Sequence, residues 1–297
     1  MKRIIVCDSG LGGLNIAANL FQPGRGRGAP CEVIYFNALP SRTCGFNQLP
    51  SARAQEEVLR DVLESMKSFS PDGCLMACNT LSIIYERLLR WYTPAFPVQT
   101  ITACATQVMV SALGMHPDLS LLIMGTKTTV ESGFYQAMLA KEGADVSRVR
   151  GVPCPGLATM LERGPESRAV KTYVKELSLR GRRLFDSPPP RIALMFCCTH
   201  YDYGTDLIKG IFSQAFSDSE LSCESPNSLM GKGLLGTSFT YHSRLALPAK
   251  ARQVFGEWFR RKACAPAIAE ALQNVQAEPR LFPFSKPQTD SEKSLGK

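Results

Sequence analysis

The sequence predicts an α/β fold with room for two domains. Apolar runs of strand length alternate with amphipathic stretches of helix length along most of the chain. Two of these strand-to-helix units end alike, the first in Cys78 and Thr80 and the second in Cys198 and Thr199. The 297 residues suffice for two domains with cores of ordinary size. Because open α/β sheets bind ligands at the carboxyl ends of their strands, we expect the two cysteine units to meet at one site.

The first part of the chain begins with an apolar run at 4–7, a glycine-rich turn at 8–14 and a helix. The turn lacks the third glycine of a dinucleotide motif, but it offers backbone N–H groups that suit a carboxylate as well as a phosphate. An apolar stripe predicts a helix from 51 to about 70, with Ser51 as its N-cap. Further strands are predicted at 31–36, 74–77 and 98–101, and a further helix at 80–91.

After a proline-rich break at 94–97 the alternation starts again. Strands are predicted at 119–124, 146–152 and 192–196. Helices are predicted at 103–113 and 168–184; between them, one helix runs through residue 139 and a short one ends at residue 162. A short run at 221–224 is expected to be a strand of the first domain, and 249–262 has helical spacing. The domains are therefore expected to be 1–97 plus about 221–275, and 98–220. The polar tail, 276–297, is expected to be at least partly disordered.

Composition excludes several classes of protein. No apolar run approaches the roughly 20 residues of a membrane span. The apolar N-terminal segment ends at Asp8, which is too short for a secretory signal. Eleven cysteines, an odd number spread over a long chain, argue against a secreted disulfide framework. The sequence contains no Cys-x-x-Cys motif, which argues against a structural zinc site. We therefore expect a cytoplasmic protein with no membrane partner and no metal, in which most cysteines are small buried hydrophobes.

The net charge is +8, with a pI of about 9.0. Arginine-containing patches lie at 24–28, 180–183 and 260–262. Such patches occur in nucleic-acid-binding proteins, but they also occur in solvated loops and helix ends, where they attract anionic small molecules. Because no nucleic-acid-binding motif accompanies the charge, the second explanation is favoured.

The paired cysteines suggest acid–base chemistry at a carbon atom. Moving a proton from one face of a carbon to the other requires a base on one side and an acid on the other. A free thiol titrates near pH ~8.5, so both of its forms are accessible near neutrality, and a helix N-terminus favours the thiolate. Thr80 and Thr199 can hydrogen-bond a carboxylate or an amine, and His200 can relay a proton or hold a thiolate. A Cys–His hydrolase and buried structural cysteines are the alternatives.

The motifs resemble those of the glutamate racemases, which belong to the cofactor-independent aspartate/glutamate racemase superfamily. The matching motifs are Asp8-Ser9-Gly10-x-Gly12-Gly13, Ala77-Cys78-Asn79-Thr80-x-Ser82 and Cys198-Thr199-His200-Tyr201. Supporting matches are Gly125-Thr126-x-x-Thr129-x-x-Ser132-x-x-Tyr135 and Cys154-Pro155 with Glu162. The resemblance covers residues 4 to roughly 225.

The resemblance implies two pseudo-symmetric three-layer α/β domains with mostly parallel sheets and an active site in the cleft between them. It implies no cofactor, an amino-acid or related carboxylate substrate, and a role in supplying a D-amino acid for peptidoglycan in cell wall biogenesis. It assigns acid–base chemistry to Cys78 and Cys198. Assisting residues would be Asp8, His200 and Glu162, and substrate-binding residues would be Ser9, Asn79, Thr80, Thr199, Thr126, Thr43, Cys44 and Gly45. The oligomeric state is not determined, and a homodimer is one option.

The sequence also departs from the family pattern. The loop after the second strand has Asn37-Ala38 in place of an Asp, and Thr43-Cys44-Gly45 in place of the Pro-Tyr-Gly that grips the substrate carboxylate. Cys197 replaces a glycine and Asp202 replaces a proline around the second cysteine. The reaction type is therefore better supported than the substrate.

The leading hypothesis is a racemase that uses no pyridoxal phosphate and no metal, with glutamate as its nominal substrate. A second hypothesis is a relative that acts on another amino acid or a diacid, as an isomerase or a decarboxylase. A third is a non-catalytic binding protein with a basic surface, whose binding would be sensitive to salt.

Overall fold

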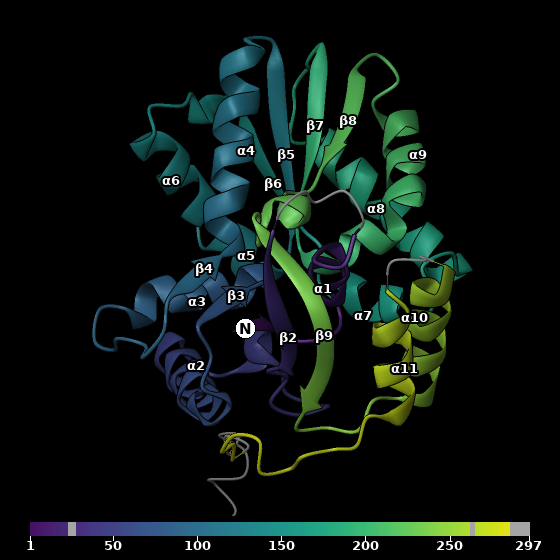
Figure 1. Ribbon diagram of the computed structural model, residues 1–297. Helices are drawn as coiled ribbons and strands as arrows, with labels where there is room; N and C mark the ends of the chain where they lie inside the picture. The colour runs from purple at the N-terminus through teal and green to yellow at the C-terminus, as the bar shows by residue number, and fades with distance from the viewer. Residues whose placement is uncertain (23–27, 262–264, 286–297) are drawn as a thin grey trace, which may run out of the picture.

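The computed structural model describes residues 1–22, 28–261 and 265–285, which form two α/β domains (Figure 1). The first sheet has the strand order β4-β3-β1-β2-β9 and the second the order β6-β5-β7-β8. The first sheet consists of β1 (Lys2–Asp8), β2 (Ala29–Asn37), β3 (Gly73–Met76), β4 (Val98–Thr100) and β9 (Leu234–Ser243). The second consists of β5 (Leu119–Gly125), β6 (Val149–Pro153), β7 (Arg191–Cys197) and β8 (Glu220–Glu224). Every pairing in them is parallel, which confirms the predicted fold class.

Helices cover both faces of each sheet. In the first domain they are α1 (Leu14–Asn19), α2 (Ala52–Met66), α3 (Asn79–Leu88), α10 (Ala249–Arg261) and α11 (Pro266–Asn274). Around the second sheet they are α4 (Ile101–Met115), α5 (Lys127–Glu131), α6 (Phe134–Lys141), α7 (Leu157–Arg163), α8 (Arg168–Arg182) and α9 (Thr205–Ala215). Ser51 caps α2 as predicted, since its hydroxyl accepts the Ala54 N–H at 3.1 Å. The arginines of the 180–183 patch lie at the C-terminal end of α8, where their positive charge interacts favourably with the helix dipole.

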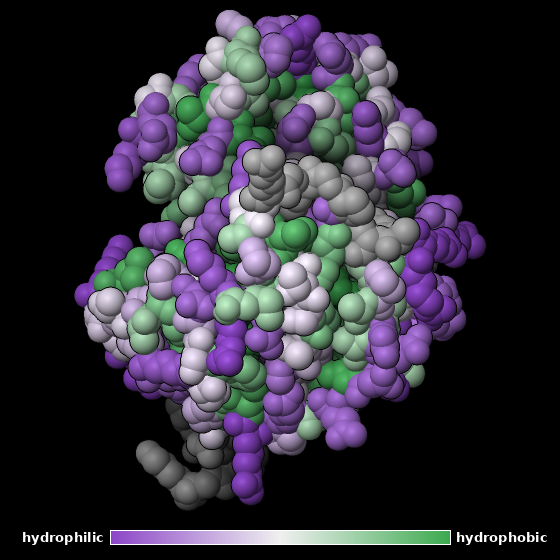
Figure 2. All heavy atoms as spheres, viewed as in Figure 1, coloured by the Kyte–Doolittle hydropathy of each residue, from purple (hydrophilic) through white to green (hydrophobic). Residues whose placement is uncertain are grey.

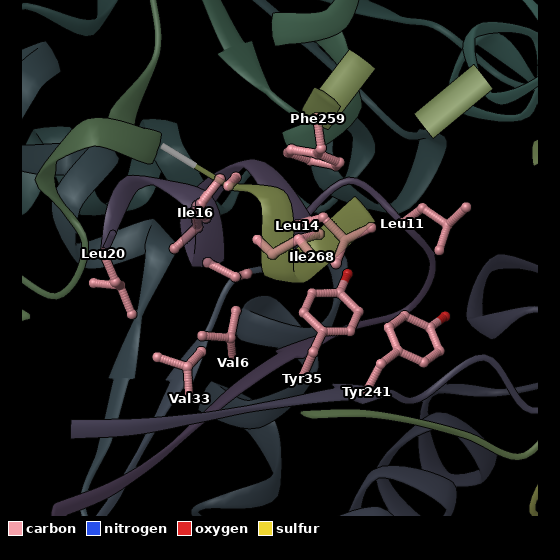
Figure 3. Close-up of a cluster of buried hydrophobic side chains, with 14 of the residues drawn as sticks. Val6, Leu11, Leu14, Ile16, Leu20, Val33, Tyr35, Tyr241, Phe259 and Ile268 are labelled. Atoms are coloured by element: carbon pink, nitrogen blue, oxygen red, sulfur yellow. The ribbon is translucent and has the colours of Figure 1, made fainter. Parts of the chain in front are cut away.

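The core follows from the alternation of side chains along a strand. In β1, Ile4 and Val6 enter one apolar cluster, whereas Ile5 and Cys7 enter the cluster on the opposite face of the sheet. Because both faces are covered, β1 is a continuous apolar run, as buried parallel strands usually are. Figure 3 shows the first cluster, in which Tyr35 of β2 and Tyr241 of β9 stack with ring centroids 5.3 Å apart.

Two strand assignments from the sequence were wrong. The run at 221–224 belongs to β8, which pairs with β7 in the second sheet, where Glu220 also forms an ion pair with Arg191 at 3.0 Å. The run at 98–101, expected to begin the second domain, is β4 at the edge of the first sheet. Such short strands carry no signal of the sheet they join, because the paths of their neighbours decide it. The sequence analysis also missed β9, whose half-exposed residues lack a clear apolar pattern.

The first part of the C-terminal segment is ordered, which an at least partly disordered tail allows. Residues 276–285 pack along the first domain: Phe282 is buried, and Arg244 Nε donates to its carbonyl at 3.1 Å. The buried aromatic ring supplies the apolar surface that fixes this segment. The rest of the predicted disordered tail, 286–297, lies outside the described residues, as do Arg25, Arg27 and Lys262 of the basic patches.

Charged and polar side chains dominate the face seen in Figure 2, with apolar patches between them. Within the described ranges, none of the helices is both long and apolar enough to cross a membrane. Ten cysteines lie in these ranges; all are free thiols, and all but Cys223 are buried, as predicted for most of them.

Candidate active site

A cavity of about 320 Å³ is lined by residues from the carboxyl ends of both sheets. Cys78, which follows β3, and Cys198, which follows β7, both line it. Most of the other predicted site residues share this lining, namely Asp8, Ser9, Asn79, Thr80, Thr126, Glu162, Thr199, His200 and Gly45. Folding therefore brings together two cysteine units that are 120 positions apart in the sequence.

Cys78 is the N-cap residue of α3 and is 9% exposed. Its sulfur lies 3.1 Å from the hydroxyl oxygen of Ser9. Burial, together with the charge of Asp8, raises the pKa of Cys78 to about 12, although the Ser9 hydrogen bond acts in the opposite direction. Cys198 is the smallest contributor to this raised pKa, which shows that the two cysteine side chains are close enough to interact electrostatically. The arrangement thus disfavours two simultaneous thiolates and favours one thiolate beside one thiol.

Cys198 has a histidine partner. The sulfur of Cys198 lies 3.8 Å from His200 Nδ1, and His200 Nε2 lies 2.8 Å from Glu162 Oε1. Burial acts to lower the pKa of His200, but its interactions with Cys198 and Glu162 outweigh burial and hold the pKa well above its ordinary value. An imidazolium in this position stabilises a neighbouring thiolate.

Two polar atoms in the lining lack a hydrogen-bond partner within the described residues. One is Oδ1 of Asp8, whose other oxygen accepts the Thr199 hydroxyl at 3.0 Å. The second is Nδ2 of Asn79, whose Oδ1 accepts the Tyr135 hydroxyl. Buried polar atoms are nearly always paired, so this unpaired acceptor and this unpaired donor suit a ligand that offers a donor group and an acceptor group. An amino acid carries both groups on one carbon.

The glycine-rich turn has a different role from the expected one. A Cβ atom on Gly12 would overlap the Thr199 side chain and lie 2.5 Å from His200 Nδ1. The turn lacks side chains there because the segment after β7 packs directly on it. Its backbone N–H at Leu11 does meet a carboxylate, but that carboxylate belongs to Glu162, at 3.3 Å.

Comparisons with known proteins agree with this geometry. No family model matches the chain. A glutamate racemase of a Nitratiruptor species is 28% identical over 216 residues, which are 71% of this chain and 76% of that protein. One of Staphylococcus aureus is 26% identical over 201 residues, 67% of this chain and 70% of that protein. These relatives agree with the resemblance to the glutamate racemases that the motifs carry. The homologues indicate an amino-acid racemase of the class that works without a cofactor.

Solved glutamate racemases share the fold. The Bacillus anthracis isoform RacE1 matches with a TM-score of 0.67 and 20% identity, over 86% of this chain and 93% of that one. The Francisella tularensis enzyme, crystallised in complex with D-glutamate, matches with a TM-score of 0.62 and 21% identity, over 87% and 94% of the two chains.

The loop after β2 is where this chain departs from the expected site. Thr43 is exposed and does not line the cavity, and the Cys44 side chain is buried in the core of the first domain. The Cys44 N–H donates to Ser41 Oγ at 2.9 Å, and the Gly45 N–H donates to Gln48 Oε1, also at 2.9 Å. Thr43 and Cys44 therefore lie outside the cavity in which they were expected, whereas Gly45 lines it with its N–H already satisfied by its own loop.

Sequence reasoning missed four polar residues in the lining: Asn47, Gln48, Lys127 and Thr159. Lys127 directly follows Thr126 in the polar turn after β5, so its position at a strand end was a usable signal. Asn47 had no such signal, since it reaches the other domain only through tertiary packing, where its Oδ1 accepts the Thr128 N–H at 3.4 Å.

The other departures have structural roles. Asn37 is buried away from the cavity, and its Nδ2 donates to the Tyr241 hydroxyl at 2.9 Å. Asp202 Oδ2 accepts hydrogen bonds from Asn15 at 2.9 Å and Asn227 at 2.7 Å, which connects the second cysteine unit to α1 of the first domain. Within the described ranges, no three His, Cys, Asp or Glu side chains are grouped so that they could hold a metal ion.

Proposed function

We propose that the protein racemises an amino acid by moving the α-proton between Cys78 and Cys198, with glutamate as the nominal substrate. The observation that carries the proposal is that both sulfurs line one small cavity and interact electrostatically within it. A thiolate on one side removes the α-proton, and the thiol on the other side delivers a proton to the opposite face of the planar carbanion. The two sulfurs exchange protonation states, so the reverse reaction uses the same groups.

The substrate would be held by the two unpaired polar atoms. Asp8 Oδ1 accepts from the α-ammonium group, and Asn79 Nδ2 donates to the α-carboxylate. The hydroxyls of Thr80 and Thr126, 2.9 Å apart, hydrogen-bond to each other across the two domains, so the pair offers the substrate one donor at most. Closure of the cleft around both charged groups fixes the α-carbon between the sulfurs.

The two halves of the site differ in how they favour the thiolate. His200 carries positive charge beside Cys198, and Glu162 stabilises that charge. Cys78 has only the Ser9 hydroxyl and the α3 N-terminus beside it, so it rests as a thiol. In the free enzyme we therefore expect the Cys198 side to act first as the base. Ser9 offers the hydrogen bond that a thiolate on Cys78 needs later.

Glutamate is the nominal substrate because the curated relatives carry that name. In the loop after β2, the N–H groups of Cys44 and Gly45 are satisfied by Ser41 and Gln48, so neither is free for the substrate carboxylate. The second candidate is therefore a different substrate, either another amino acid or a diacid, and the loop geometry favours it.

The test combines circular dichroism with α-deuterium exchange in D₂O, using D- and L-glutamate and a panel of other amino acids. We expect loss of optical activity and deuterium incorporation from both enantiomers. Cys78→Ser and Cys198→Ser should each lower turnover by roughly 10³-fold or more, because a serine hydroxyl is a far weaker acid at neutral pH. Cys223→Ser, outside the cavity, is the matched control and should be close to wild type.

Two outcomes would contradict the proposal. No exchange with any amino acid would exclude racemisation of these substrates. Full turnover in either cavity variant would instead indicate a one-sided reaction, such as isomerisation or decarboxylation of a diacid.

A further inference from the structure

A second cavity, of about 670 Å³, adjoins the active-site cavity at the loop that follows β2. We call it the outer cavity. Six residues line both spaces: Gly10, Leu39, Gly45, Gln48, Thr159 and Glu162. The shared residues place the two cavities side by side, so an anionic group in the outer one would lie next to a ligand held between the cysteines.

The outer cavity is strongly basic. Its lining includes Arg42, Arg163 and Lys250, and none of the three has an ion-pair partner in the part of the chain that the structure describes. Arg42 is held in place by its own hydrogen bond, from Nη2 to the Ala246 carbonyl at 3.1 Å. Three unpaired cations around one cavity create a positive potential that suits an anionic group.

The only carboxylate in this lining, among the described residues, does not neutralise that charge. It belongs to Glu162, whose Oε1 is already engaged by His200 at 2.8 Å and by the Leu11 N–H at 3.3 Å. The outer cavity thus has three free cations and one carboxylate that is committed elsewhere.

The inner cavity cannot readily bind a second anion of the substrate. The loop N–H groups at Cys44 and Gly45 are satisfied by Ser41 and Gln48. The side chain of Lys127, the one lysine in the inner lining as described, is 69% exposed and lies 3.9 Å from Glu131. Free positive charge for a side-chain carboxylate is therefore concentrated in the outer cavity.

We infer that the outer cavity binds the anionic end of an amino-acid substrate whose side chain is longer than that of glutamate. This inference rests on the proposed function, since it assumes that the α-carbon lies between Cys78 and Cys198. The α-ammonium and α-carboxylate groups occupy the inner cavity, and the distal carboxylate binds Arg42, Arg163 and Lys250. A bidentate arginine contact would supply most of the selectivity for a planar carboxylate.

The first experiment measures kcat/KM for α-deuterium exchange across a series of increasing length: aspartate, glutamate, 2-aminoadipate and 2-aminopimelate. Norleucine provides a long side chain without charge. We expect kcat/KM to be roughly 10-fold or more higher for 2-aminoadipate or 2-aminopimelate than for glutamate, and lowest for norleucine. Equal or higher kcat/KM for glutamate would overturn the inference.

The second experiment uses the variants Arg163→Ala and Lys250→Ala. Each should raise KM for the preferred long diacid by about 10-fold while changing kcat little, because the removed contact is made equally in ground and transition states. Alanine exchange, which uses no distal anion, should be unaffected. Arg168→Ala, an exposed arginine on α8 outside both cavities, is the matched control.

Binding separates this inference from the proposed function. Titration calorimetry of 2-aminopimelate should show weaker binding to both variants than to the wild type. If that difference is found without any exchange, the racemase proposal fails while the outer cavity stands as an anion site. If exchange occurs but binding and KM are the same in all variants, the outer cavity has no such role.

Discussion

The hydroxyl of Tyr135, from α6, donates to Oδ1 of Asn79, at the start of α3. The contact crosses from the second domain to the first and is buried, since Tyr135 is 1% exposed and Asn79 is 2% exposed. It fixes the amide orientation, because an oxygen that accepts from Tyr135 leaves Nδ2 directed elsewhere, and this atom has no protein partner within the described residues. Cys197, which replaces the glycine of the family pattern, interacts with the same hydroxyl. Tyr135 and Cys197 thus orient the Asn79 side chain so that its amide nitrogen is the group left for the substrate.

Tyr135→Phe should therefore weaken substrate binding more than catalysis. Without its donor the Asn79 amide can rotate, and we expect KM to rise about 10-fold with kcat within about 3-fold of wild type. Steady-state kinetics of the exchange reaction measures both constants. Tyr92→Phe, which removes a surface hydrogen bond to Glu64, is the control and should leave both constants unchanged. A fall in kcat with KM unaltered would contradict the orienting role.

The ionised carboxylate of Asp8 should lower the stability of the folded protein while it serves the reaction. Burial, opposed by His200 and Thr199, raises its pKa from 3.8 to about 6. Folding therefore favours the protonated form, so the protein loses stability as pH rises from 3.8 to about 6, and the full loss is present above that range. Asp8→Asn should increase the free energy of unfolding by about 2–3 kcal/mol at pH 8 and by nearly nothing at pH 4.

The same substitution should abolish α-deuterium exchange, because a neutral amide lacks the negative charge with which the Asp8 carboxylate binds the ammonium group of the substrate. In the wild type, KM should rise as pH falls below about 6, where Asp8 becomes protonated. Urea denaturation at the two pH values and KM against pH are the measurements. If the two proteins are equally stable at pH 8, burial does not destabilise the ionised carboxylate.

Glu162→Gln should move the pH dependence of the reaction. Glu162 is one of the groups that raise the pKa of His200, so its neutral replacement should lower that pKa. The variant should then lose activity on the alkaline side at a lower pH than wild type, with kcat reduced by roughly 10- to 100-fold. Proton NMR titration of His200 and a kcat profile across neutral and alkaline pH report the change. Glu166→Gln, an exposed neighbour in the chain, should match wild type.

Gly12→Ala should separate the two cysteine units. The new methyl group would overlap the Thr199 side chain and crowd His200, so the segment after β7 must move. We expect a loss of about 1–3 kcal/mol in stability and at least about a 100-fold loss in exchange, measured by thermal unfolding and deuterium incorporation. Gly114→Ala, in the open and helical part of α4, should instead stabilise by about 0.5–1 kcal/mol.

The sequence by itself determined the α/β class and the two cysteine units. Apolar runs such as 192–196 are local features, and strand-end positions for Cys78 and Cys198 follow from them directly. The position of His200 beside Cys198 made it a candidate too, and the family resemblance supplied the others; all the candidates but Thr43 and Cys44 line the cavity.

Only the tertiary structure decided which sheet β4 and β8 join, what the glycine-rich turn contacts and which loop N–H groups remain free. Each depends on groups distant in sequence: Thr199 fills the space that Gly12 leaves open, and Glu162 takes the N–H of Leu11. The loop after β2 is the clearest case, since Ser41 and Gln48 satisfy Cys44 and Gly45 only in the folded geometry. Local patterns report which face of an element is apolar, whereas the pairing of polar groups is settled by packing between elements.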